Sequence, residues 1–173
     1  ALHYHSYSNL LIHSWGDGSY PDEPYLTTLR EIGNEMTHYN GYLVGTGIET
    51  VGYTVNGDAV DWSYGNAGLL SYTPEIGSFV DNFWPSEDRV IPLCQDQIYS
   101  NSIFAMVAGS DYIIYDKLYN NMYPSINDTI SISLVIQNRG ILSSNGPVTI
   151  DITPLNSFSN VSNDNIILES LYA

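Results

Sequence analysis

The segment HYHSYSN, residues 3–9, followed by LLIHSWG, residues 10–16, combines two alternating histidines with a short apolar run. Alternation along a strand would place His3 and His5 on one face and Tyr4 on the other. A histidine at the end of a short strand can serve as a metal ligand, as a general base or as a packed core residue. The segment alone leaves these three roles open, so the partners must come from the rest of the chain.

Length and composition are typical of a globular protein. The chain has 173 residues, of which 43% are hydrophobic, enough to bury a core in one domain or in two small ones. No apolar run approaches the ~20 residues of a membrane-spanning helix, and the first residues show no basic and apolar signal segment. Cys94 is the single cysteine, so no disulfide can form within the chain. We expect it to be a small buried side chain on a helix.

The charge of the chain is strongly acidic. Four Lys and Arg residues stand against nineteen Asp and Glu residues, which gives a formal net charge of −15. A surface of this sign repels the phosphate backbone, so nucleic acid is excluded as an expected partner. The acidic, lysine-poor composition rich in Tyr, Ser and Asn is typical of secreted bacterial proteins, and we expect an extracellular location.

Two segments have the apolar spacing of helices. Residues 22–41 repeat apolar side chains at helical intervals, with Asp22 as the expected N-cap and Pro24 in the first turn. Residues 91–109 form the second predicted helix, with Pro92 in its first turn. The segment between them is glycine-rich and irregular until LLSYT, residues 69–73, which has the composition of a short buried strand.

Beyond residue 110 the pattern becomes that of an all-β protein. TISISLVI, residues 129–136, alternates isoleucine and leucine with small polar residues, and the apolar residues of 148–152 alternate again. No helical pattern is found there. We therefore divide the chain into an α/β domain, residues 1–110, and an appended β-sandwich-like module, residues 111–173, which can itself be incomplete.

A metal site is not evident from spacing alone. The chain has four histidines and contains no H-x-x-E or H-E-x-x-H pair. Glu35 and His38 could place two ligands on one helical face, but we favour a solvated helix end, where a histidine lies near the negative pole of the helix. Zinc needs three or four ligands, so these patterns supply candidate ligands without a complete site.

Four motifs in order resemble the zinc metallocarboxypeptidases of the carboxypeptidase A/B type. HSYSN and LLIHSWG, residues 5–16, resemble the family's H-S-Y-S-Q segment. Tyr53 with NGDAVDW, residues 56–62, resembles its mobile tyrosine and G-x-x-x-D-W stretch. SYTPEIG, residues 71–77, resembles S-F-T-x-E-L, and FWPSEDRVIP, residues 83–92, resembles the F-x-x-P before the last helix.

The resemblance implies an α/β fold, the C-terminal part of a mixed-sheet carboxypeptidase domain. It implies that His5 is a zinc ligand and that Glu75 is the catalytic glutamate, which takes a proton from zinc-bound water. The family's other two zinc ligands, an H-x-x-E pair, belong to a part of the domain that precedes this one. The arginines that hold the substrate carboxylate also lie there, and neither Arg30 nor Arg89 is in their place. Pro74, before the glutamate, departs from the family pattern and removes a backbone donor.

The resemblance also implies substrate contacts. Tyr53 would close over the substrate as part of a glycine-rich lid, and Ser6 and Tyr7 would line the cleft. Val60 corresponds to the base of the family's side-chain pocket, where an apolar residue implies a preference for apolar C-terminal residues.

The function expected from these residues is that of a fragment of a secreted, zinc-dependent carboxypeptidase. Its substrates would be the C-termini of peptides and proteins, and its cofactor one zinc ion, with the site incomplete in this chain. The alternative is a non-catalytic binding or scaffold module with the same fold. Apolar surfaces exposed by truncation would favour self-association.

Overall fold

The computed structural model describes residues 1–157 and 159–172. The chain forms two compact units, Ala1–Phe104 and Ala105–Ala173. This division lies close to the expected boundary at residue 110. Whether the two units are independent domains stays a prediction.

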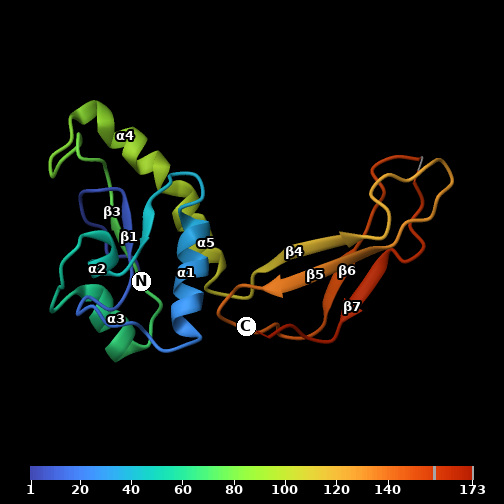
Figure 1. The fold of residues 1–173 in the computed structure, drawn as a ribbon, viewed down its shortest axis with the longest axis horizontal. Coiled ribbons are helices and arrows are strands. Elements are labelled where there is room, and N and C mark those ends of the chain that lie inside the picture. The colour runs from blue at the N-terminus through green and yellow to red at the C-terminus, as the bar shows by residue number, and fades with distance from the viewer. Residues whose placement is uncertain (158, 173) are drawn as a thin grey trace. The chain divides into compact units, whose positions relative to one another are not determined.

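A three-stranded mixed sheet forms the centre of the first unit (Figure 1). Its strands are β1 (Leu10–Ile12), β2 (Leu43–Gly45) and β3 (Thr73–Glu75), in the order β2-β1-β3. The central strand β1 is parallel to β2 and antiparallel to β3. The predicted strand at 69–73 therefore begins later than expected and continues through Glu75.

The register gives the sheet two different faces. Leu11 pairs with Val44 on one side and with Pro74 on the other, so these three side chains share one face. Ile12 and Thr73 pair on the opposite face, because successive side chains along a strand alternate. One face therefore packs against helices, and the other is left to the loops that follow β1 and β2.

Helix α1 (Tyr25–Met36) covers the first face. Gly33 permits close approach, because a Cβ there would lie 2.7 Å from Val44 Cγ1 and 3.6 Å from Leu11 Cδ2. Tyr72, which is fully buried, donates its hydroxyl to the carbonyl of Leu29 at 2.7 Å. Its ring also packs edge-on against Phe104, so a second helix covers the same face.

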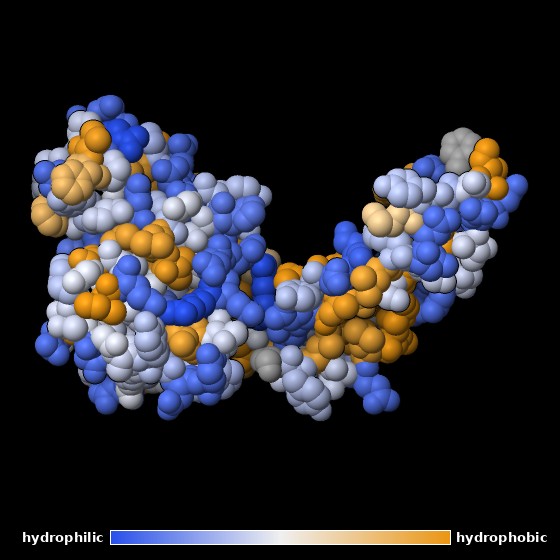
Figure 2. Space-filling model, in the orientation of Figure 1, coloured by the Kyte–Doolittle hydropathy of each residue, from blue (hydrophilic) through white to orange (hydrophobic). Residues whose placement is uncertain are grey.

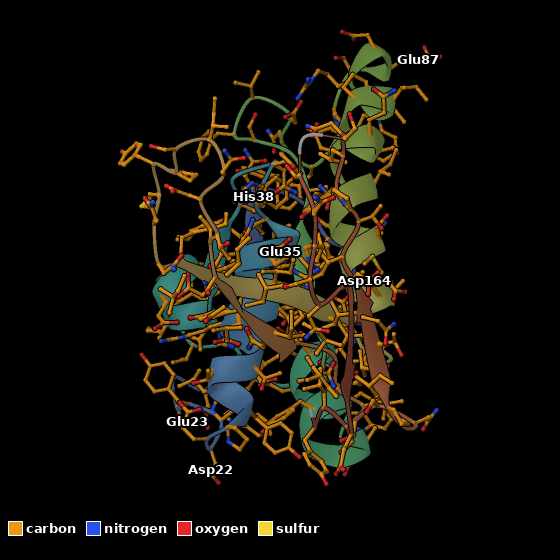
Figure 3. The ribbon with its side chains drawn as sticks, turned by 90° about the vertical axis from the view of Figure 1, so that its right-hand side faces the viewer. Asp22, Glu23, Glu35, His38, Glu87 and Asp164 are labelled. Atoms are coloured by element: carbon orange, nitrogen blue, oxygen red, sulfur yellow. The ribbon has the colours of Figure 1, made fainter. Side chains whose placement is uncertain are left out.

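The helix predicted at 22–41 is shorter than expected. It is preceded by Pro24 as N-cap and ends at Met36, and Asp22 lies outside its first turn (Figure 3). Asp22 instead accepts a backbone hydrogen bond from Tyr25 through its carbonyl. The expectation of an Asp22 side-chain cap was wrong, because the chain enters the helix through proline.

The first five residues pair in parallel with β3. Tyr72 donates to the Ala1 carbonyl, His3 to the Tyr72 carbonyl, and Ile76 to the His5 carbonyl. His5 donates in turn to the Pro74 carbonyl. In a regular parallel ladder, residue 74 would donate to the His3 carbonyl, and proline has no N–H to do so. The ladder is therefore reduced to two isolated bridges, Leu2 with Tyr72 and His5 with Glu75.

Two short helices interrupt the segment predicted to be irregular. These are α2 (Gly47–Thr50) and α3 (Ala59–Ala67). The first begins with a capping box, in which Thr46 and Glu49 exchange hydrogen bonds, and the second has Asp58 as N-cap. Because this segment is rich in glycine, the sequence analysis predicted it to be irregular and did not identify these two helix caps.

The helix predicted at 91–109 is two helices, α4 (Glu87–Asp96) and α5 (Ile98–Met106). Helix α4 begins four residues before Ile91, with acidic residues in its first turn, so Pro92 lies inside it. Cys94 is exposed on α4, which corrects the expectation of a buried side chain.

The second unit contains two separate two-stranded antiparallel sheets. One pairs β4 (Tyr112–Tyr119) with β5 (Ile132–Asn138), and the other pairs β6 (Val148–Asp151) with β7 (Asn165–Leu168). No helix begins after residue 106 in the part of the chain that the structure describes, as expected, but a sandwich is not confirmed.

Apolar side chains gather on one surface of this unit (Figure 2). Large apolar residues of this unit that are exposed include Ile114, Leu118, Ile132 and Ile167, without assignment to one patch. Self-association stays a prediction. Among the described residues, no helix has the length and apolarity to cross a membrane.

Candidate functional site

His5 and Glu75 lie side by side although they are far apart in the sequence. They are partners in a parallel bridge, so both side chains point to the same side of β3. His5 Nδ1 lies 3.1 Å from each carboxylate oxygen of Glu75. The His5 side chain is 63% exposed and that of Glu75 is 14% exposed, so the carboxylate lies deeper than the imidazole.

A cavity of about 330 Å³ opens beside this pair. It is bounded by the face of the sheet that α1 does not cover, together with the loop after β1, helix α2 and the start of α3. The lining residues that matter below are His5, Glu75, Tyr53, Val60, His13 and Thr73. Four of these, His5, Glu75, Tyr53 and Val60, were expected at the site from the sequence.

The start of α3 positions Val60 in the cavity wall. Asp58 accepts a hydrogen bond from the Val60 N–H at 3.1 Å and so caps the helix. The Val60 carbonyl accepts from the hydroxyls of Ser14 and Ser71. Val60 is 1% exposed and therefore presents a fixed apolar surface.

Tyr53 lies in the loop between α2 and α3. Its side chain is 62% exposed, and the residue lines the cavity. Gly52 and Gly57 flank it with positive φ angles of 82° and 78°, conformations that glycine adopts at low cost. Glycine permits the turn on each side of Tyr53, and movement of the loop stays a prediction.

Ser6 and Tyr7 are not among the residues that line this cavity. The Tyr7 ring instead packs edge-on against Phe79 and Phe83, with ring centroids 5.5 Å and 5.0 Å away. These three rings form an aromatic cluster, of which Tyr7 lies two residues after His5 in the sequence. The substrate contacts expected of Ser6 and Tyr7 stay predictions.

The loop after β1 is held to α3 by Asp61. Its two carboxylate oxygens accept hydrogen bonds from the Gly16 N–H at 3.1 Å and 3.0 Å. Burial raises the pKa of Asp61, and the hydrogen bond from Gly16 opposes this shift. A side chain at Gly16 would meet the Val55 carbonyl at 2.7 Å. Asp61 therefore acts as a structural anchor.

Sequence reasoning missed most other residues of the cavity wall, His13 and Thr73 among them. His13 is fully buried and hydrogen-bonds through Nδ1 to the Ser14 carbonyl at 2.7 Å. Burial lowers the pKa of His13. The signal for His13 was its place at the end of an apolar run, where a polar side chain must either find a partner or line a site.

The described residues do not complete a metal site. They contain no group of three or more His, Cys, Asp or Glu side chains that could hold a metal ion. His3 is occupied with Ser63, whose hydroxyl lies 2.9 Å from His3 Nε2. At the cavity, His5 and Glu75 are in contact with each other, and two such side chains are fewer than the three protein ligands that a catalytic zinc requires.

The Glu35 and His38 pair does not form a site either. The Glu35 carboxylate accepts the Tyr99 hydroxyl at 2.5 Å. His38 is exposed and its ring packs edge-on against Tyr39. His38 is thus exposed just beyond the end of α1, whereas Glu35 is half-buried and hydrogen-bonded.

The two arginines of this unit are engaged away from the cavity. Arg30 binds Glu49 at 2.7 Å, and Arg89 binds Asp81 at 2.6 Å. The guanidinium of Arg89, with help from Ser78, holds the pKa of Asp81 well below its usual range. Neither Arg30 nor Arg89 is among the residues that line the cavity.

The sequence profile of the zinc carboxypeptidase family matches residues 1–100. This chain belongs to the zinc carboxypeptidase family, whose members are zinc-dependent hydrolases that act on peptides. The structure of bovine thrombin-activatable fibrinolysis inhibitor, in complex with tick carboxypeptidase inhibitor, has a TM-score of 0.53 and 21% identity over 60% of this chain and 37% of that chain. Carboxypeptidase A of Helicoverpa armigera has a TM-score of 0.53 and 22% identity over 60% and 28%. The chain therefore spans well under half the length of either structure, and no curated protein sequence matches it.

Proposed function

We propose that this chain supplies the C-terminal part of the catalytic domain of a zinc carboxypeptidase, which hydrolyses the last peptide bond of peptides and proteins. The observation that carries the proposal is the pairing of His5 and Glu75 at a cavity lined by Tyr53 and Val60. The family match over residues 1–100 supports the same reaction class.

Glu75 has the position required of a general base. Its carboxylate is mostly buried yet lines the cavity, so it can accept a proton from a water molecule and return it to the leaving amine. Zinc, when bound, lowers the pKa of that water. His5 would be one of the zinc ligands, and its 3.1 Å contact with Glu75 supports a base close to the bound metal.

The remaining zinc ligands would come from outside these residues. The matched shares of 37% and 28% leave more than half of each of those chains without a counterpart here. The 173 residues alone are therefore expected to bind zinc weakly and to lack peptidase activity.

The cavity favours apolar C-terminal side chains. Ile12, Val51 and Val60 contribute its apolar wall. Tyr53, from its glycine-flanked loop, would close over the bound residue and exclude water from the reacting bond. An extracellular location is part of the proposal and is supported by the acidic, lysine-poor composition.

The test compares three variants of the full-length protein on a peptide that ends in leucine. Glu75→Gln should reduce kcat by about 10²–10⁴-fold while leaving zinc content unchanged, because the amide keeps its shape but cannot take a proton. His5→Ala should lower zinc content, and excess zinc should restore part of the activity. Glu31→Gln, an exposed change on α1, is the matched control and should behave as wild type.

Two results would contradict the proposal. Retention of more than about a tenth of kcat by Glu75→Gln would remove Glu75 as the base. A full-length protein that neither binds zinc stoichiometrically nor cleaves any C-terminal residue would instead favour the non-catalytic scaffold.

A further inference from the structure

The chain contains three Asn-Gly pairs, Asn40-Gly41, Asn56-Gly57 and Asn145-Gly146. Asparagine is one of the thermolabile residues of proteins. A following glycine increases this lability, because it has no Cβ and its backbone nitrogen can approach the amide carbon of the asparagine side chain closely. The three pairs share this local chemistry, so any difference in their stability comes from how the fold holds them.

The fold engages both reacting groups of Asn40-Gly41. The side-chain nitrogen of Asn40 donates to the Asp96 carbonyl and to Ser100 Oγ, each at 3.3 Å. Its side-chain oxygen accepts a hydrogen bond from the Tyr42 N–H at 3.2 Å. The Gly41 N–H donates to the Thr37 carbonyl at 2.8 Å. An attack of the Gly41 nitrogen on the Asn40 side chain therefore requires these hydrogen bonds to break.

The pair Asn56-Gly57 has no such restraint. Both residues are exposed in the loop that follows Tyr53. Among the residues that the structure describes, none forms a hydrogen bond with the Asn56 side chain or with the Gly57 N–H. The φ angle of Gly57 is 78° and that of Gly41 is 68°, so the two glycines have similar conformations. The two pairs thus differ in hydrogen bonding rather than in backbone conformation at the glycine.

We propose that Asn56 is a site of spontaneous deamidation in the folded protein, which converts it to aspartate and isoaspartate. The Gly57 nitrogen attacks Cγ of Asn56 and forms a C–N bond, and the amide nitrogen leaves as ammonia with the proton of the Gly57 N–H. Water then adds to one of the two carbonyl carbons of the resulting succinimide and opens the ring. The net reaction consumes one water and releases one ammonia, and it needs no oxidant, reductant or enzyme. The inference is independent of the proposed function.

The position of Asn56 gives this reaction a structural consequence. Its neighbours Val55 and Asp58 line the cavity, and each is an anchor of the loop. The Val55 N–H donates to the Gly16 carbonyl at 2.7 Å, and Asp58 accepts from the Val60 N–H at 3.1 Å. Isoaspartate moves the side-chain methylene into the backbone and lengthens the chain between the two anchors. We expect the hydrogen bond of Val55 to weaken as a result.

The first experiment compares the three pairs within one molecule. The full-length protein is incubated in H₂¹⁸O at mildly alkaline pH and digested at acidic pH, and the ¹⁸O content of each pair is measured by mass spectrometry. Asn56 should take up the label at least about tenfold faster than Asn40, because freeing Asn40-Gly41 breaks several hydrogen bonds. The exposed Asn145, which does not line the cavity, should react at a rate similar to that of Asn56.

The same incubation in guanidinium chloride separates the effect of the fold from that of the sequence. In the unfolded chain, Asn40 and Asn56 should react at similar rates, because both are followed by glycine and neither is held. Asn56→Gln is the matched variant, since its longer side chain would have to close a larger ring. It should keep the fold and take up no label at this position.

A second experiment measures the structural consequence without any activity assay. Isoaspartate at residue 56 is identified by chromatography against synthetic peptides, and hydrogen exchange is followed in the peptide that contains Val55. The aged wild-type protein should exchange the Val55 amide at least about tenfold faster than the aged Asn56→Gln protein, because loss of this hydrogen bond lowers the cost of opening.

Three outcomes overturn the inference. These are labelling of Asn56 as slow as that of Asn40 in the folded protein, a tenfold difference that persists in guanidinium chloride, and unchanged exchange at Val55 in protein that contains isoaspartate. The second result would assign the difference to the local sequence instead of the fold. None of these measurements depends on hydrolysis, so a protein without peptidase activity would contradict only the proposed function.

Discussion

Replacing Gly33 with alanine tests how α1 is seated on the sheet. An added Cβ would lie 2.7 Å from Val44 Cγ1, well inside the roughly 3.5–4.0 Å of a normal carbon contact. Alanine gains about 1 kcal/mol of intrinsic helix stability over glycine. Overpacking of a well-packed interior costs about 1–3 kcal/mol, and the β-branched Val44 has little rotamer freedom with which to move away. We expect a net loss of about 1 kcal/mol in the free energy of unfolding.

The measurement is urea unfolding followed by tyrosine and tryptophan fluorescence. Asn34→Ala, at the next and exposed position of α1, is the control and should show no steric loss. Val44→Ala combined with Gly33→Ala should recover stability relative to the sum of the single changes, because the added methyl group then has room. A Gly33→Ala protein that is more stable than wild type would refute the close contact between α1 and β2.

Two further predictions concern buried hydrogen bonds in the first unit. Tyr72→Phe removes the hydroxyl that donates to the Leu29 carbonyl and should lower the free energy of unfolding by about 1 kcal/mol in urea titrations, and an unchanged midpoint would contradict this. The folded pKa of Asp81 lies below its unfolded value, so its pairing with Arg89 stabilises the fold above about pH 4 and loses this effect as the pH falls further. The stability difference between wild type and Arg89→Gln should therefore shrink from pH 7 to about pH 2, and a constant difference would refute the linkage.

The sequence located the main residues of the candidate site through ordered motifs rather than through spacing. His5 and Glu75 are neighbours only because the first residues pair in parallel with β3, and no local periodicity reports such a pairing. The departure at Pro74 was visible in the sequence, and its effect is the interruption of that ladder. Val60 and Tyr53 line the same cavity. Val60 lies on a helix with an Asp58 N-cap and Tyr53 in a loop flanked by glycines, and both features are visible in the local sequence.

Other features depended on tertiary structure. The unpaired state of His13 Nε2 is a property of its surroundings, so a histidine after an apolar run could be either satisfied or functional. The prediction of the second helix was wrong because Pro92 was interpreted as lying in the first turn. The acidic residues after Ser86 mark the observed start of α4. The β module was recognised from alternation, which specifies strands but does not specify how separate sheets pack.

The parallel bridge between His5 and Glu75 has a consequence for the order in which the first unit folds. The two residues are seventy positions apart, and closing a loop of that length costs about 4 kcal/mol of chain entropy before any contact between them can offset it. Such long-range contacts form late, after local helices such as α1. A ligand that contacts both residues would link two segments of the unit that are seventy residues apart in the sequence, and it would slow the unfolding of the unit. Protection of the His5 amide from hydrogen exchange would then report on the integrity of the site itself.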